Sequence, residues 1–161
     1  MANYTNSRGW RNNNPLNIRK SKAEWKGLSP EQNDKAFCQF ISMAYGYRAA
    51  IKTLQTYHDR FAKHGRPFTI ENIVSTWAPA SDGNNPDGYA AKVAIWSGID
   101  RQQVLPPPNT QRAVRIFCRI MAAMTRVECG VPDGKIPWDS IAAGYSLVYR
   151  NLIVKQEEVK L

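Results

Sequence analysis

The sequence predicts a mainly α-helical fold organised as one domain. In several segments apolar residues recur at intervals of three and four, the period of an amphipathic helix, whereas stretches with the alternation of a strand are few. A chain of 161 residues, 43% of them apolar, is long enough to bury a core without disulfides. We therefore expect a domain over residues 1–152 and a solvated C-terminal tail over residues 153–161.

The first forty residues lack the helical period and predict a loop-rich segment or a small β-hairpin. Three consecutive asparagines and the turn formers Pro15, Gly27 and Pro30 interrupt the segment, and only short runs such as AFCQF resemble a strand. Residues 1–17 are polar and contain no apolar stretch of the kind found in a secretory signal peptide. We therefore expect the protein to be made in the cytoplasm, so that any extracellular role needs another exit.

Two helices are predicted in the next part of the chain. The first has Ser42 as candidate N-cap and Gly65 as candidate stop. The apolar positions that set its period are Tyr47, Ala50, Ile51, Leu54, Tyr57 and Phe61. The second is a short helix over residues 70–77 that Thr69 caps and that ends before Pro79.

Further helical segments are predicted after the turn-rich loop SDGNNPDG. A short helix is expected over residues 89–96, and the prolines of residues 105–108 predict a stiff extended connector. A long helix follows over residues 110–129, with Gly130 as its stop. Residues 137–150 are expected to form another short helix or an extended segment.

The chain is basic, with 22 Lys and Arg against 13 Asp and Glu and a formal net charge of +9. This indicates attraction to a polyanion such as nucleic acid, a membrane surface or an anionic cell-wall polymer, without distinguishing between them. Because the basic residues are dispersed and form no block, a nucleic-acid partner is only weakly supported. No apolar run approaches the roughly 18 residues of a membrane span, so none is expected.

The cysteines and histidines predict neither a disulfide nor a metal site. Cys38, Cys118 and Cys129 are an odd number, and the last two lie too far apart on one predicted helix to be bridged. We expect all three to be reduced and mostly buried. His58 and His64 have no partner pair at ligand spacing, so no structural zinc, and no other metal or cofactor, is predicted.

A glutamate stands at the end of the helix predicted over residues 110–129. The apolar residues that lead up to it are Val114, Phe117, Met121 and Met124. The next step of four residues reaches Glu128, so its carboxyl points toward the core and lies in the last turn, where the helix dipole is negative. Both effects raise the pKa of a carboxyl, as a general acid in glycoside cleavage requires. The alternative is a glutamate at the edge of the stripe that reaches water or pairs with Arg126 or Lys135.

Residues 11–19, RNNNPLNIR, resemble the signature R-N-N-N-P-G-N-I-R of a family of phage and prophage virion proteins that are lysozyme-like. The similarity covers roughly residues 8–130 and continues through Trp25, Gly27, residues 37–57, residues 69–79 and Tyr89. AAMTRVECG, which ends at Gly130, resembles the end of the catalytic helix in the lysozyme-like superfamily. The resemblance implies a single lysozyme-like domain with Glu128 as general acid.

The order of the motifs and two substitutions depart from these relatives. Residues 11–19 also resemble the N-N-x-F-G-I-K motif of wall-degrading glucosaminidases, in which the helix with the glutamate precedes the motif. Here that helix comes after it, which implies a circular permutation. Leu16 stands where the family has glycine, a position that we expect to need an unusual backbone conformation. Asp82 stands near an expected glutamate, in a longer loop.

The predicted substrate-binding residues are Asn13, Asn14, Asn17, Trp25 and Tyr89. The asparagines are predicted to bind N-acetyl and hydroxyl groups of a sugar. The alternative is that their side chains only stabilise a tight loop through hydrogen bonds within it. The two aromatic residues are predicted to present ring faces to sugars, whereas Trp77 is assigned to the core. Asp82 joins Glu128 as a predicted catalytic residue that positions water or stabilises developing positive charge. We assign Arg19 no role beyond a solvated surface.

These features predict a phage or prophage protein that binds the glycan strands of peptidoglycan and cleaves them as a lytic transglycosylase or muramidase. One clear acid favours the single-glutamate mechanisms of lytic transglycosylases. Other virion proteins are possible partners, and packaging in a virion or release at lysis fits the polar N-terminus. Two alternatives stay open. One is a non-catalytic virion or wall-binding module, which Leu16 and the Asp82 loop favour; the other is a basic nucleic-acid-binding protein.

Overall fold

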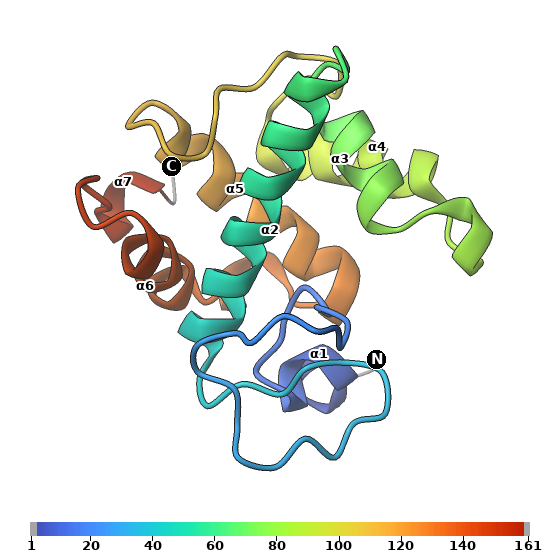
Figure 1. Cartoon of the computed structure of the whole chain (residues 1–161), viewed down its shortest axis with the longest axis vertical. Helices are drawn as coiled ribbons and strands as arrows, with labels where there is room; N and C mark the ends of the chain where they lie inside the picture. Colours follow the sequence, from blue (N-terminus) through green and yellow to red (C-terminus); the bar gives the residue numbers. More distant parts are fainter. Residues whose placement is uncertain (1–2, 160–161) are drawn as a thin grey trace.

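The computed structural model describes residues 3–159 and confirms the mainly helical fold (Figure 1). The helices are α1 (Arg8–Arg11), α2 (Met43–Lys63), α3 (Ile70–Trp77), α4 (Pro86–Ser97), α5 (Ala113–Cys129), α6 (Trp138–Val148) and α7 (Gln156–Val159), with short 3-10 turns at Tyr4–Asn6, Ala80–Asp82 and Asp133–Lys135. Two isolated β-bridges, Arg19 with Phe37 and Leu28 with Phe40, are the β structure of the described chain. The N-terminal segment is therefore loop-rich, and no hairpin forms within it.

Helix α2 runs through the middle of the molecule and the other elements gather around it (Figure 1). Its most extensive contact is with α6, while α3 and α4 pack together and α4 packs against α5. Gly144 makes the close approach of α6 to α2 possible, since a Cβ there would lie 2.7 Å from the Cβ of Tyr47. The N-terminal loops cover one end of α2 (Figure 1).

Several helix ends follow the local signals in the sequence. The Thr69 hydroxyl accepts a hydrogen bond from the Asn72 N–H at 3.1 Å and so caps α3. Helix α5 ends at Gly130, which has a φ of +70°. Helix α4 begins three residues earlier than predicted, because Asn85 caps it and Pro86 occupies its first turn.

The core combines apolar side chains with a few buried polar contacts. The Tyr47 hydroxyl and the Thr125 hydroxyl lie 2.7 Å apart in the interior and join α2 to α5. All three cysteines are buried and unbridged. No helix of the described chain is long and apolar enough to span a membrane.

The C-terminal segment contacts the rest of the fold at a few residues. Gln111 binds the backbone of Ile153 twice, accepting from its N–H at 2.9 Å and donating to its carbonyl at 2.8 Å. Helix α7 then packs against α5 and α6 and buries Val159. Most side chains of residues 153–159 are exposed, as a solvated tail predicts, while Val154 and Val159 pack against the core. Residues 160–161 lie outside the described residues.

Candidate functional site

The Glu128 carboxyl at the end of α5 meets two side chains from distant parts of the chain. Its Oε1 accepts a hydrogen bond from Nδ2 of Asn17 at 2.7 Å, and its Oε2 accepts one from the Tyr89 hydroxyl at 2.9 Å. Asn17 comes from the N-terminal loop and Tyr89 from α4. Glu128 is partly buried by these neighbours, so the carboxyl is held in one place by elements that only the fold brings together.

Burial dominates the electrostatics of this carboxyl. It raises the pKa of Glu128 above the usual value, and the hydrogen bonds from Asn17 and Tyr89 and the charge of Arg19 oppose the shift without cancelling it. Burial and the nearby Glu128 charge also raise the pKa of Tyr89 well above its usual value. The tyrosine therefore stays protonated and remains a donor to the carboxyl at neutral pH.

The Asn-rich loop is tied by its own side chains. Asn14 is fully buried; its Nδ2 donates to the carbonyls of Ile18 and Cys38 at 2.9 Å, and its Oδ1 accepts from the Ile18 N–H at 2.8 Å. Asn13 donates from Nδ2 to the Phe40 carbonyl at 3.1 Å. The tight loop holds Asn13 and Asn17 at φ values of +52° and +55°, a region that asparagine tolerates better than most residues.

Gly9 of α1 makes room for Asn17 at the site. A Cβ at Gly9 would lie 2.9 Å from Asn17 Oδ1 and 2.9 Å from Cys129 Sγ, so only glycine allows this approach of helix and loop. Asn17 Oδ1 is itself buried without a hydrogen-bond partner. The Asn17 side chain therefore makes its polar contact on one side only, toward Glu128.

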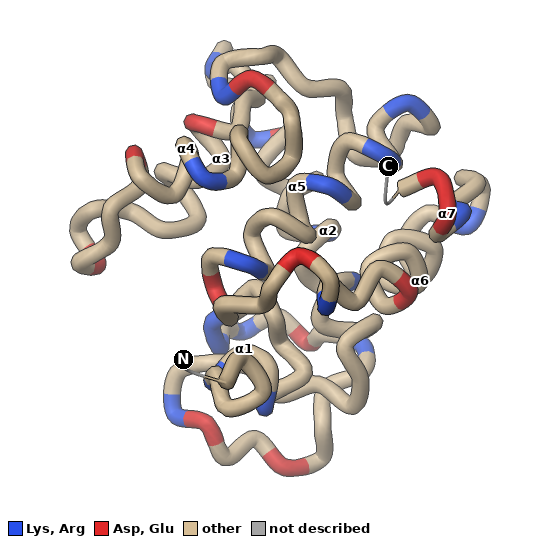
Figure 2. Tube along the Cα trace, turned by 180° about the vertical axis from the view of Figure 1, so that it is seen from behind, with Lys and Arg blue, Asp and Glu red and all other residues tan. Residues whose placement is uncertain are grey.

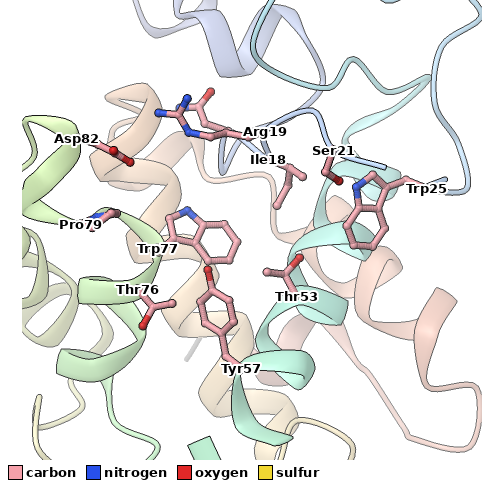
Figure 3. Close-up of a pocket in the computed structure, with 11 residues that line it drawn as sticks. Ile18, Arg19, Ser21, Trp25, Thr53, Tyr57, Thr76, Trp77, Pro79 and Asp82 are labelled. Carbon is pink, nitrogen blue, oxygen red and sulfur yellow. The ribbon is translucent and has the colours of Figure 1, made fainter. Parts of the chain in front are cut away.

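Asn17 also lines an open cleft of about 350 Å³ (Figure 3). Its other lining residues are Ile18, Arg19, Ser21, Trp25, Thr53, Tyr57, Thr76, Trp77, Pro79 and Asp82. Figure 3 shows Trp77 and Tyr57 between Trp25 on one side and Asp82 on the other, and the rings of Tyr57 and Trp77 meet edge to face at 5.9 Å. The cleft thus combines aromatic faces with hydroxyl groups, one cation and one anion.

Comparison with known proteins identifies a relative from a phage. No model of a protein family matches this chain. The chain is 36% identical over 142 residues to Protein P5 of Pseudoalteromonas phage PM2, and the alignment covers 86% of this chain and 80% of that protein. The chain belongs to the Protein P5 family. This agrees with the predicted phage origin, while the name Protein P5 states no activity.

Only some of the predicted site residues lie at the cleft of this P5-family protein. Asn17, Trp25 and Asp82 line it, and Glu128 adjoins it through Asn17. Asn14 and Tyr89 are not among the lining residues. Asn14 is buried and its amide binds backbone groups, and the Tyr89 ring is buried. Their predicted sugar-binding roles stay predictions that this geometry does not support. Asn13 is not among the lining residues, and its amide ties the loop.

Most of the lining residues were not predicted from the sequence, among them Tyr57, Trp77 and Arg19, and one inference from the sequence was wrong. Trp77, assigned to the core, lies at the cleft, where its indole N–H donates to the Leu16 carbonyl at 3.2 Å. Arg19, assigned to a solvated surface, lines the same cleft. Leu16 is buried at 1% exposure and its φ is not positive, so its backbone is ordinary and its side chain fills the core. The expectation of an unusual, glycine-like conformation there is wrong.

Proposed function

We propose that this P5-family protein binds glycan strands of peptidoglycan in the cleft and cleaves them with Glu128 as general acid. The observation that supports this best is a carboxyl of raised pKa, positioned by Asn17 and Tyr89, at the edge of an aromatic-lined cleft. A raised pKa increases the protonated fraction near neutral pH, and a protonated carboxyl can donate to the leaving glycosidic oxygen.

The cleft has the chemistry that a sugar ligand requires. Trp25, Tyr57 and Trp77 offer apolar surface for the C–H faces of pyranose rings. Hydroxyl groups along the same walls can exchange hydrogen bonds with sugar hydroxyls. The volume of about 350 Å³ lies within the range of ligand sites, and the net charge of +9 would retain the protein on an anionic wall.

A lytic transglycosylase mechanism suits this arrangement better than a two-carboxylate one. The side chains that bind the Glu128 carboxyl are an amide and a phenol, and Asp82 is exposed at the cleft. In the proposed step Glu128 gives its proton to the glycosidic oxygen as the bond from that oxygen to C1 breaks. The 6-hydroxyl of the same sugar attacks C1 and returns a proton to Glu128, so a 1,6-anhydro sugar forms and no water is consumed. In a muramidase, Asp82 would instead position water.

One observation favours a second candidate, a non-catalytic virion or wall-binding module. Both oxygens of Glu128 already accept hydrogen bonds, and Glu128 is not itself among the lining residues of the cleft. In this case Glu128 would be a structural link between α5, α4 and the N-terminal loop. A nucleic-acid-binding role has less support, since Figure 2 shows Lys and Arg scattered over many elements and interspersed with Asp and Glu.

Digestion of purified peptidoglycan, with mass spectrometry of the released fragments, tests the proposal. We expect the wild type and Glu31→Gln, a change at an exposed glutamate, to release 1,6-anhydro muropeptides, and Glu128→Gln to release none. Fragments that end in a reducing N-acetylmuramic acid would instead identify a muramidase, and fragments that end in a reducing N-acetylglucosamine would identify a glucosaminidase. If the wild type binds the wall but releases nothing, the cleavage proposal is overturned and the binding module is favoured.

A further inference from the structure

A second, smaller pocket lies on α5 away from the cleft. It has a volume of about 80 Å³ and forms where the end of α4 and the start of α6 approach α5. Arg119 and Arg126 of α5 reach into it, and Trp96 and Trp138 form two of its walls. It shares no lining residue with the cleft that contains Asn17, so its function can be considered separately.

The helix geometry brings the two arginines to one face. Arg119 and Arg126 are two turns apart on α5, about 10 Å along the axis, and residues one turn from each share their side. The positions between them that line the pocket are Ala122 and Ala123, whose small side chains leave the space open. Two long cationic side chains therefore border one pocket whose floor is small and apolar.

Of the two guanidinium groups, only that of Arg126 has an ion pair in the described chain, and that pair is long. Arg119 pairs with no carboxylate among residues 3–159. Its Nη2 packs over the end of α4, where a Cβ on Gly98 would lie 3.1 Å away. Arg126 stacks 4.0 Å from the ring centroid of Trp96, and its nearest carboxylate, Asp133, is 3.8 Å away and largely exposed. The stacking holds Arg126 in place while its charge stays available.

We propose that this pocket binds a phosphate group. The pocket is much smaller than the cleft, at about 80 Å³ against about 350 Å³, so it suits a compact group better than a large ligand. Two guanidinium groups can each bind a pair of oxygens, and a tetrahedral phosphate presents more acceptor oxygens than a carboxylate does. The pocket carries two cations against the single anion Asp133, so its net charge suits such a ligand.

Calorimetric titration with inorganic phosphate at constant ionic strength tests the site. Arg119→Gln should weaken binding at least about tenfold, since a charged hydrogen-bonding partner is lost, and Arg126→Gln should act in the same direction. Asp133→Asn, which removes the competing carboxylate, should tighten binding a few fold. Arg119→Lys should bind more weakly than the wild type, because a lysine keeps the charge and loses the planar fork.

Arg115→Gln is the matched control, since Arg115 is exposed on the same helix and lies outside the pocket. It should leave phosphate binding within about twofold of the wild type. An equal loss in Arg115→Gln and Arg119→Gln would show general charge attraction and overturn the site, as would tighter binding of acetate than of phosphate. Thermal unfolding of each variant separates loss of the site from loss of the fold.

Two further probes identify the source of the phosphate group. Arg119-dependent sedimentation with poly(glycerol phosphate) would point to a wall polymer, and Arg119-dependent sedimentation with phosphatidylglycerol vesicles would point to a lipid headgroup. Arg119-dependent binding of inorganic phosphate alone would point to a free ligand. Each of these three results supports the phosphate site, and none depends on whether Glu128 cleaves glycans.

Discussion

Asn17 donates a hydrogen bond of 2.7 Å to Glu128 across a sequence separation of 111 residues. The bond joins the N-terminal loop to the last turn of α5 and connects the carboxyl to the cleft. It also stabilises the ionised carboxyl, so it opposes the effect of burial on the pKa of Glu128. This contact therefore contributes to both the position and the pKa of the candidate acid, together with Tyr89 and burial.

Asn17→Gly should raise the pKa of Glu128 further, because a donor to the ionised form is lost while glycine tolerates the positive φ. The control is Asn13→Gly, which has a similar φ but removes a bond to the Phe40 carbonyl. Carbon-detected NMR titration of the Glu128 carboxyl measures both. A pKa that is unchanged or lower in Asn17→Gly would contradict this account of the site.

Glu128→Gln should make the protein more stable at neutral pH. A carboxyl whose pKa is raised by folding stabilises the fold fully below its unfolded pKa, and this contribution is lost as the pH rises through the folded pKa. The neutral glutamine avoids the cost of burying a charge, so the melting temperature of the variant should exceed that of the wild type at pH 7. The gap should close as the pH falls below the usual range of glutamate. Thermal unfolding from pH 3 to pH 8 measures it, and a variant that is less stable at pH 7 would argue against desolvation as the dominant effect.

Tyr47→Phe should destabilise the fold by about 1 kcal/mol, because it removes a buried hydrogen bond to Thr125. For a chain of this length the melting temperature should fall by about 2–4 °C. Tyr45→Phe serves as the control, since Tyr45 is only partly buried and packs against the core without such a bond. Equal effects in the two variants would show that packing, and not the hydrogen bond, matters at Tyr47.

Asp34→Asn should loosen the N-terminal loop. Asp34 accepts two hydrogen bonds of 2.6 Å from Arg8 and two of 2.9 Å from the N–H groups of Ala36 and Phe37, and these partners lower its pKa well below the usual value. A lowered pKa means that the contribution to stability is present above the unfolded pKa and is lost as the pH falls toward the folded pKa. The variant should therefore melt lower than the wild type at pH 7.

The same measurement at low pH provides the check, since the difference between wild type and Asp34→Asn should shrink in acid. Arg8→Gln should reproduce much of the neutral-pH loss. The double variant should then lose less than the sum of the two single losses, because both changes remove one shared contact. Strict additivity would show that the pair does not act as a unit.

Local patterns in the sequence were sufficient for most of the helices. The apolar period of α2, the Thr69 cap of α3 and the Gly130 stop of α5 all act within a few residues of the backbone that they shape. The same spacing placed Glu128 toward the interior, and the direction of its pKa shift agrees with that prediction. The short segment of α7 has too few residues for a detectable period, and its place follows from contacts with distant residues such as those of Gln111 with Ile153.

Local sequence patterns did not predict which side chains from distant parts of the chain contact one another. Three asparagines lie within five positions, yet their side chains have different partners. Asn13 donates to the Phe40 carbonyl, Asn14 to backbone carbonyls of the loop and Asn17 to Glu128. In the same way, Tyr89 is buried and donates to Glu128, a contact that its place in the sequence did not indicate. These differences depend on which segment packs beside each residue.

Periodicity and capping act over a few residues, so the sequence was sufficient to predict the helical class, most of the main helices and the place of Glu128 at a helix end. The contacts of that carboxyl with Asn17 and Tyr89, the cleft that Trp77 and Arg19 line, and the pocket that Arg119 and Arg126 share follow from the fold. Hydrogen bonds, desolvation and cavities arise between segments far apart in the chain, and packing brings these segments together.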